Sequence, residues 1–191
     1  MKVYLVRHGQ SLANATKIHS GWSQVPLTEQ GEADAARTGE YLQTLQFDRI
    51  YSSDLLRAIQ TAHIAPPGCE PVQLALVRER NVGSLVGRPF EECAQEYGDA
   101  YWEARKTLDF TPYGGENREM LYDRAAEFLK SLEENPADSI VVFTHEGFIG
   151  SCMEVVLGVI IDRKKLRCAN GSVTILSFEN GLWQLCTFAR D

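Results

Sequence analysis

Uncharged apolar runs and stripes of apolar residues at helical spacing alternate along this sequence. The apolar runs predict four strands, at residues 2–6, 49–52, 72–77 and 139–144. The stripes predict four helices, at about residues 28–45, 53–65, 117–135 and 147–157. Strand and helix therefore succeed one another through most of the chain, which is typical of α/β proteins with a largely parallel sheet.

Capping residues indicate where these helices begin and end. Expected first residues are polar side chains that accept a hydrogen bond from the first turn, at Thr28, at Ser53 or Asp54, and at Asn117. Expected stops are residues that cannot continue a helix, at Pro66-Pro67, Pro136 and Gly158.

The end of the chain has the pattern of a hairpin. Residues 173–178 and 182–188 are apolar runs joined by Glu179-Asn180-Gly181, and Asn-Gly is the preferred dipeptide of a type I′ turn. The fold class that we predict is therefore α/β, with three layers, α/β/α, and a mostly parallel central sheet that gains an antiparallel edge. An exposed sheet edge at this hairpin favours a homodimer.

Residues 83–115 break the alternation. They consist of turns and short helical pieces, with aromatic residues among Arg88, Arg105 and Lys106. Long irregular segments of this kind are often lids over a binding site. We predict one domain over residues 1–191, with a cap-like insertion at about 84–115.

Composition narrows the classes of function. The chain has 191 residues, 44% of them hydrophobic, and a net charge of −7, which argues against a nucleic-acid or anionic-membrane partner. No apolar run approaches the roughly 18 residues that span a membrane, and no signal peptide is recognisable. The five cysteines have no C-x-x-C spacing, so we expect free thiols and a cytoplasmic protein.

Polar residues of catalytic type follow the predicted strands. Arg7 and His8 end the first strand, Glu79 follows the third, His145 follows the fourth, and Arg57 lies at the start of the helix after the second. Because parallel strands end at one edge of a sheet, these side chains are expected to converge there.

Two guanidinium groups suit a dianionic phosphoryl group better than an acyl carbon or a sugar ring. One neutral imidazole would attack phosphorus, and the second, when protonated, would bind the phosphoryl oxygens. A carboxylic acid would protonate the leaving alkoxide.

The sequence resembles the histidine phosphatase superfamily, whose members are the phosphoglycerate mutase-like proteins. The first block is residues 5–14 with Arg7-His8-Gly9, and five further blocks follow in order: 21–31, 51–62, 78–87, Gly114-Gly115-Glu116, and Thr144-His145 with Gly147. The resemblance implies a phosphoglycerate mutase-like fold.

Carried over by position, the resemblance implies a role for each matched residue. His8 becomes phosphorylated, Arg7, Arg57 and His145 bind the phosphoryl group, and Glu79 acts as proton donor and then as base. Further phosphate- or substrate-binding residues are expected at Asn14, Gly147, Gln10 and Trp22. No metal and no cofactor are expected, because His145-Glu146 lacks the second histidine of a zinc-protease motif and His19 and His63 have no ligand spacing.

Two residues depart from the family pattern. Glu146 stands where a glycine is usual, and Gln10 stands where mutases commonly carry glutamate. An acidic side chain at position 146 would repel the ligand if it pointed inward, or favour the helix dipole if it did not.

The predicted function is a metal-independent phosphomonoesterase that hydrolyses a small phosphorylated metabolite through a phosphohistidine. Mutases of the family carry a longer insertion before Gly114, and a short cap favours hydrolysis because a mutase must exclude water. The alternatives are a cofactor-dependent phosphoglycerate mutase and a non-catalytic module that binds phosphorylated ligands.

Overall fold

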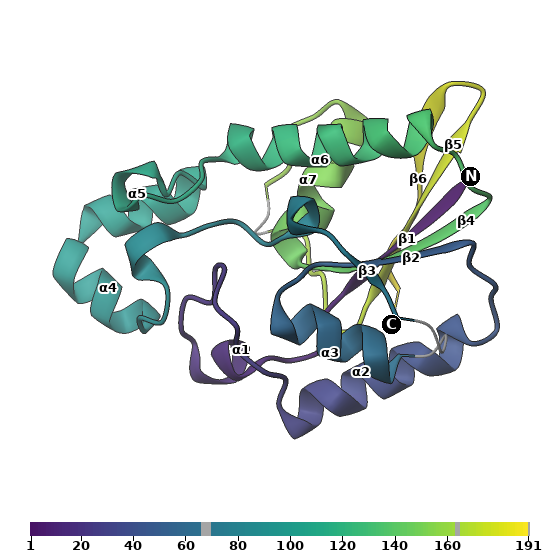
Figure 1. Cartoon of the computed structure of the whole chain (residues 1–191). Helices are drawn as coiled ribbons and strands as arrows, with labels where there is room; N and C mark the ends of the chain where they lie inside the picture. The colour runs from purple at the N-terminus through teal and green to yellow at the C-terminus, as the bar shows by residue number, and fades with distance from the viewer. Residues whose placement is uncertain (66–69, 163–164, 191) are drawn as a thin grey trace.

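A six-stranded sheet lies at the centre of the computed structural model, which describes residues 1–65, 70–162 and 165–190 (Figure 1). The strands are β1 (Lys2–Arg7), β2 (Arg49–Ser52), β3 (Val72–Gln73), β4 (Ser139–Thr144), β5 (Val173–Glu179) and β6 (Leu182–Arg190). Their order is β3-β2-β4-β1-β5-β6; the first four are parallel, and β5 pairs antiparallel with both β1 and β6. The predicted mostly parallel sheet with an antiparallel edge is confirmed.

Helices cover both faces of this sheet, as predicted. In Figure 1, α2 (Glu29–Leu42) and α3 (Leu56–Ile64) lie below it, and α6 (Arg118–Glu134) and α7 (Glu146–Leu157) lie above. Alternate residues of β1 face the two layers: Val3 and Leu5 belong to the cluster with α6 and α7, whereas Tyr4 and Val6 belong to the cluster with α2 and α3. A strand buried on both faces explains why this run is continuously apolar.

The helix N-caps predicted from the sequence are confirmed for α2 and α6 and are wrong for α3. The side chains of Thr28 and Asn117 accept hydrogen bonds from the first turns of α2 and α6. At α3 the N-cap is Leu55, without a side-chain bond, because Asp54 pairs with Arg78 and the Ser53 hydroxyl accepts only from the Leu55 N–H. The helix predicted to about Leu45 ends at Leu42, and the stop expected at residues 66–67 lies outside the described residues.

The strand predicted at residues 72–77 is wrong in its length. Only Val72 and Gln73 pair with β2, and the chain then forms the 3₁₀ helix η1 (Ala75–Val77). This turn buries Val77, whose carbonyl accepts a hydrogen bond of 2.6 Å from the Thr144 hydroxyl. An edge strand pairs with one neighbour only, so few hydrogen bonds are lost when its last residues form a turn that packs into the core. Glu79 therefore follows a 3₁₀ turn and not a strand.

A small helix also lies between β1 and α2. It is α1 (Leu12–Thr16), and the side chains and backbone of Ser11 and Asn14 form a capping box at its start. The hairpin turn is as predicted, because Asn180 and Gly181 have φ values of 53° and 78°.

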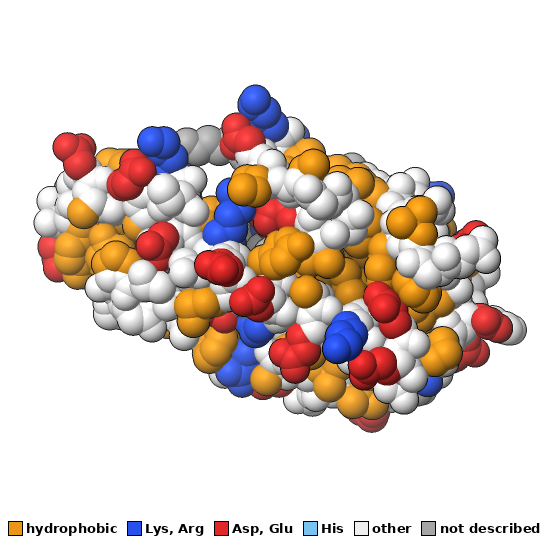
Figure 2. Space-filling model, turned by 90° about the horizontal axis from the view of Figure 1, so that it is seen from above, with side chains coloured by type: hydrophobic (Ala, Val, Ile, Leu, Met, Phe, Trp, Pro, Cys, Tyr) orange, Lys and Arg blue, Asp and Glu red, His pale blue; other side chains and the backbone are white. Residues whose placement is uncertain are grey.

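The irregular segment has its own hydrophobic cluster. It contains η2 (Gly83–Leu85), α4 (Phe90–Tyr97), α5 (Asp99–Thr107) and η3 (Thr111–Tyr113). Val82, Leu85, Cys93, Tyr101 and Phe110 pack together there, apart from the two clusters of the sheet. The segment extends from the body in Figure 1 and forms the narrower lobe on the left of Figure 2.

No helix among the described residues is long and apolar enough to cross a membrane. The four described cysteines, Cys93, Cys152, Cys168 and Cys186, are free thiols, and Cys69 lies outside the described residues.

Candidate active site

Strand register brings the two histidines of the site together. In the parallel pair of β1 and β4, Arg7 lies opposite Thr144, so His8 and His145 leave the sheet side by side. Their ring centroids are 5.1 Å apart. Residues separated by most of the chain thus meet because their strands end at the same level.

Backbone and side-chain contacts set the tautomer of His8. Its Nδ1 lies 2.7 Å from the Gly9 carbonyl, which can only accept, so Nδ1 carries the proton. The lone pair is then on Nε2, which accepts a hydrogen bond of 3.2 Å from Arg57 Nε. Burial, with the positive charges of Arg57 and Arg7, holds the pKa of His8 well below its ordinary value. His8 is therefore a neutral imidazole with its nucleophilic nitrogen directed at Arg57.

The guanidinium of Arg57 is completely buried. Its Nη2 donates to the Gly21 carbonyl at 2.9 Å and its Nη1 to the Ser23 carbonyl at 3.1 Å, so the loop before α2 holds it in place. Burial, with a smaller effect of Arg7, lowers its pKa to about 10, and Glu79 acts in the opposite direction. Arg57 keeps its positive charge at neutral pH beside His8.

His145 is buried with both ring nitrogens lacking a hydrogen-bond partner among the described residues. Burial is the largest cause that lowers the pKa of His145 well below its ordinary value. The nearby Arg57, His8, Arg7 and Arg124 lower the pKa further. A buried polar ring without partners is rare, because the lost hydration is not replaced. An anion between His8 and His145 would supply a partner and favour protonation of His145.

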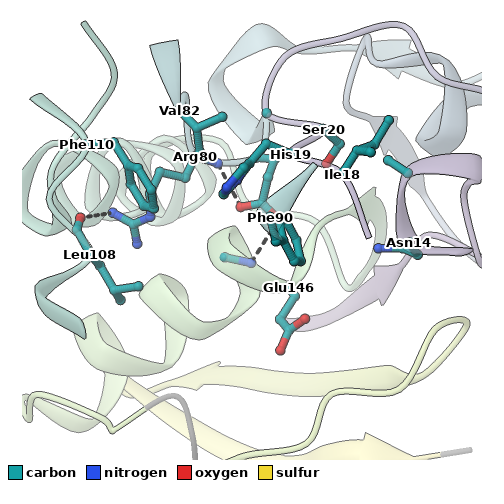
Figure 3. A pocket seen from close by; sticks show the side chains of 14 residues that line it. Asn14, Ile18, His19, Ser20, Arg80, Val82, Phe90, Leu108, Phe110 and Glu146 are labelled. Carbon is teal, nitrogen blue, oxygen red and sulfur yellow. Dashed lines mark hydrogen bonds between the residues drawn. The ribbon is translucent and has the colours of Figure 1, made fainter. Parts of the chain in front are cut away.

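Arg7, a predicted phosphate-binding residue, contacts Glu146 and the backbone of Cys168. Its Nη1 lies 2.9 Å from Glu146 Oε2 and also donates to the Cys168 carbonyl. Figure 3 shows the Glu146 carboxylate turned away from the aromatic side of the pocket. Glu146 thus does not point at the ligand position; it is the ion-pair partner of one predicted phosphate-binding guanidinium.

Glu79 reaches the site through the N-terminus of α7. Its Oε2 accepts from the Gly147 N–H at 3.2 Å, and its Oε1 accepts from the Arg80 N–H at 2.7 Å. A Cβ atom on residue 147 would lie 2.0 Å from Glu79 Oε1. Glycine at position 147 is therefore required for the carboxyl group to sit where it does.

Of the three other side chains predicted to bind phosphate or substrate, Asn14, Gln10 and Trp22, only Asn14 lines the cavity. Asn14 lines the pocket, while its Oδ1 accepts from Ser11. The Gln10 side-chain oxygen accepts from the Thr28 hydroxyl at 2.9 Å, away from the pocket lining. Trp22 Nε1 donates to the Glu79 carbonyl at 2.7 Å, so Trp22 contacts the segment that carries the acid.

A cavity of about 340 Å³ opens above these groups (Figure 3). Asn14, Glu79, Glu146 and Gly147 lie on its side toward the sheet, and residues of the 16–24 loop and of the cap complete it. His8, Arg57 and His145 are buried and do not line the cavity themselves; they adjoin it through Gly21, whose carbonyl accepts from Arg57, and through Gly147, two residues after His145. A phosphoryl group entering the cavity would have the imidazoles and guanidiniums below and the rest of its ester above.

Sequence reasoning missed Arg124, which supports the segment carrying Glu79. Its guanidinium donates to the carbonyls of Leu76, Arg78 and Glu79, and forms a two-pronged pair with Glu116 at 2.8 and 2.9 Å. An arginine within an amphipathic helix is usually solvent-exposed, so no local signal marked it.

No group of three or more His, Cys, Asp or Glu side chains within residues 1–65, 70–162 and 165–190 is placed to hold a metal ion. The functional groups that the structure brings together here are imidazoles, guanidiniums and a carboxyl group.

Known proteins resemble this chain over nearly its whole length. The sequence model of the histidine phosphatase superfamily (branch 1) matches residues 3–191. A Citrobacter koseri protein named probable phosphoglycerate mutase GpmB is 33% identical over 190 residues, which covers 96% of this chain and 87% of the relative.

Solved structures show the same fold. Bacillus stearothermophilus YhfR superposes with a TM-score of 0.92 at 26% identity, covering 100% of this chain and 97% of its own. A mycobacterial glucosyl-3-phosphoglycerate phosphatase superposes with a TM-score of 0.89 at 24% identity, covering 100% of this chain and 99% of its own.

Proposed function

The chain belongs to the histidine phosphatase superfamily, and we propose that it is a metal-independent phosphomonoesterase that hydrolyses a small phosphorylated metabolite through a phosphohistidine on His8. One observation carries the proposal. The Gly9 carbonyl fixes the proton of His8 on Nδ1, and this leaves Nε2 free to act as a nucleophile between Arg57 and His145.

In the first step, the phosphoryl group of the ester takes the place of the Arg57-to-His8 hydrogen bond. His8 Nε2 attacks phosphorus, and the N–P bond forms as the P–O bond to the leaving group breaks. Arg7, Arg57 and His145 bind the phosphoryl oxygens as negative charge is redistributed over them. Glu79, protonated at this stage, gives its proton to the leaving oxygen.

In the second step, water attacks the phosphohistidine. The Glu79 carboxylate takes a proton from the water, the N–P bond breaks, and inorganic phosphate and neutral His8 are regenerated. The Gly9 carbonyl keeps the His8 proton on Nδ1 throughout, so the ring is ready for a second cycle.

A cofactor-dependent phosphoglycerate mutase is the second candidate, favoured by the name of the Citrobacter koseri relative, probable phosphoglycerate mutase GpmB. The charge of the pocket favours the phosphatase. Arg80 is the one guanidinium among the described residues that line the cavity, and its Nη1 already donates to the carbonyls of Leu108 and Asn117. A mutase must hold the carboxylate of phosphoglycerate as well as its phosphate.

Phosphate release from p-nitrophenyl phosphate in the presence of EDTA tests the main proposal. We expect turnover in EDTA, an acid-labile phosphoenzyme on rapid quenching, and loss of both in His8→Asn. His63→Asn, which changes an exposed histidine, should leave them intact. Full activity of His8→Asn would contradict the mechanism, and binding without turnover on a broad set of esters would indicate the non-catalytic module.

Incubation with 3-phosphoglycerate and a trace of the bisphosphate separates the two enzymes. The phosphatase releases inorganic phosphate from its preferred esters and does not isomerise 3-phosphoglycerate. Rapid isomerisation without release of phosphate would establish the mutase instead.

A further inference from the structure

Apolar side chains line the cavity opposite the phosphate site. Ile18, Val82, Phe90, Leu108 and Phe110 all face it, and Figure 3 shows the rings of Phe90 and Phe110 directed into the same space. These residues come from the loop after α1 and from the cap segment. The part of a substrate that extends beyond its phosphoryl group therefore meets hydrocarbon.

The charged residues of the lining do not offer a second anion site. Glu79 and Glu146 are acidic, and the remaining charged residue, Arg80, is 5% exposed. Arg80 Nη1 donates to the carbonyls of Leu108 at 3.1 Å and Asn117 at 2.7 Å, so that end of the guanidinium holds the wall together. Glu146 is paired with Arg7 at 2.9 Å, so neither it nor Glu79 supplies a positive charge to a second anionic group.

Other ionisable groups near the wall do not change this balance. His19 lines the cavity, but burial, with a contribution from Arg105, lowers its pKa to about 4, so the ring is neutral. Arg105 and Lys106 line a neighbouring cavity beyond His19, Phe90 and Phe110. The guanidinium of Arg105 is stacked 4.6 Å above the Phe90 ring.

The wall is also preformed. Phe110 and Val82 belong to the buried cluster of the cap, and His19 Nε2 lies 2.9 Å from the Tyr101 hydroxyl, which joins the loop to α5. Arg105 donates to the same hydroxyl at 3.2 Å. A wall held by packing and by a buried hydrogen-bond chain presents one shape to the ligand.

We propose that the leaving group of the substrate is uncharged and largely apolar, and that this pocket discriminates against esters that carry a second anionic group. This inference rests on the proposed function, because it concerns the alcohol that the phosphatase releases. An apolar body gains from leaving water, whereas a second carboxylate or phosphate loses its hydration without a counter-charge.

A pair of substrates that differ in charge alone tests the inference. We compare 4-carbamoylbenzyl phosphate with 4-carboxybenzyl phosphate, whose leaving groups are alike in size and shape. The wild-type kcat/KM at pH 7 should be about tenfold or more higher for the neutral amide, because the desolvated carboxylate faces no cation. A kcat/KM that is equal or higher for the carboxylate would overturn the inference.

Substitutions at Ile18 locate the effect in the wall. Ile18→Lys places a cation in the cavity and should raise the ratio of carboxylate to amide kcat/KM by about fivefold or more. Ile18→Met is the uncharged control and should leave that ratio within about twofold. Leu108→Lys and Leu108→Met repeat the test on the cap if the Ile18 variants do not fold, and an unchanged ratio in the lysine variants would contradict the proposal.

The outcomes separate this inference from the proposed function. If neither ester releases phosphate and His8→Asn matches the wild type on p-nitrophenyl phosphate, the phosphatase proposal fails. If both esters are hydrolysed in a His8-dependent way and the carboxylate is the better substrate, only the inference about the leaving group fails.

Discussion

The two regions of the pocket, which we call the floor and the wall, differ in the polarity of their side chains. The floor consists of His8, Arg57 and His145, which are polar, buried and placed by strand ends and the start of a helix. The wall consists of Ile18, Val82, Phe90, Leu108 and Phe110, which are apolar and mostly belong to the cap. Under the proposed function, the floor would transfer the phosphoryl group and the wall would select the ester.

The two regions are also held by different forces. Two floor groups, His8 and Arg57, are oriented by directional hydrogen bonds, such as those of Arg57 to the carbonyls of Gly21 and Ser23. The wall is held mainly by packing and by edge-to-face rings, such as Tyr97 against Tyr113 at 5.1 Å. Hydrogen-bonded geometry is lost abruptly on substitution, whereas an apolar wall of the right volume tolerates exchange. We therefore expect floor variants to change kcat and wall variants to change the preference among substrates.

Removing Arg57 should have the largest effect. In Arg57→Leu the phosphoryl oxygens lose a charged donor, and we expect kcat/KM for p-nitrophenyl phosphate to fall by about 10³-fold. Arg57→Lys keeps the charge but not the fork to Gly21 and Ser23, so it should remain at least about tenfold impaired. Arg37→Ala, at an arginine with a half-exposed side chain, is the control. Wild-type activity in Arg57→Lys would show that charge alone is required.

Displacing the acid from the floor should have the next largest effect. In Gly147→Ala the new methyl group would lie 2.0 Å from Glu79 Oε1, so the carboxyl group must move. We expect kcat for an alkyl phosphate to fall by about 10²-fold. The loss should be smaller for p-nitrophenyl phosphate, whose leaving group needs no proton.

A double-mutant cycle with Glu79→Gln checks this explanation. If Gly147→Ala acts through Glu79, the double variant should be no worse than Glu79→Gln alone. Additive losses would mean that Gly147 acts through another part of the site.

Acid should destabilise the floor and the wall through their histidines. Burial depresses the pKa of His8, His145 and His19, so below pH 6.5 the unfolded chain binds protons that the folded chain does not. The free energy of unfolding should therefore fall with decreasing pH, by up to about 1.4 kcal/mol per pH unit for each histidine. Urea unfolding between pH 7.5 and 5.5 measures this slope.

Inorganic phosphate distinguishes the two regions in that experiment. An anion between His8 and His145 favours their protonated forms, so phosphate should reduce the part of the slope that comes from the floor. The part that comes from His19, whose partner is Tyr101, should stay. A slope in the His145→Asn variant that equals the wild-type slope would contradict the assignment to the floor.

Glu146, at the border of the two regions, should have the smallest effect. Its carboxylate is about half exposed and competes with the substrate for Arg7, to which it lies at 2.9 Å. Exposed ion pairs contribute up to about 1 kcal/mol, so Glu146→Gln should lower KM for p-nitrophenyl phosphate and the inhibition constant of phosphate about two- to fivefold. A raised KM would show instead that the pair orients Arg7 for binding.

Much of the fold was predictable because its signals are local. Apolar runs located β1, β2 and β4 within a residue or two, and Asn180-Gly181 determined the type of the closing turn. Arg7, His8, Arg57 and His145 were found for the same reason, since a strand end or a helix start next to them indicates the sheet edge. Thr28 and Asn117 cap α2 and α6 through bonds to residues three positions away.

The local sequence pattern could not predict contacts between segments that are far apart in the chain. The length of β3, the support of Glu79 by Arg124 and Trp22, and the pairing of Glu146 with Arg7 join residues that are far apart in sequence. The apolar wall is of the same kind, because Ile18 and Phe110 face one cavity only after the cap has packed. The sequence by itself thus determined most of the strands, the parallel direction of those that end beside His8 and His145, and which candidate side chains lie together at that edge of the sheet. The tertiary structure alone decided which partner each side chain meets, since packing selects partners by volume and geometry that no local pattern encodes.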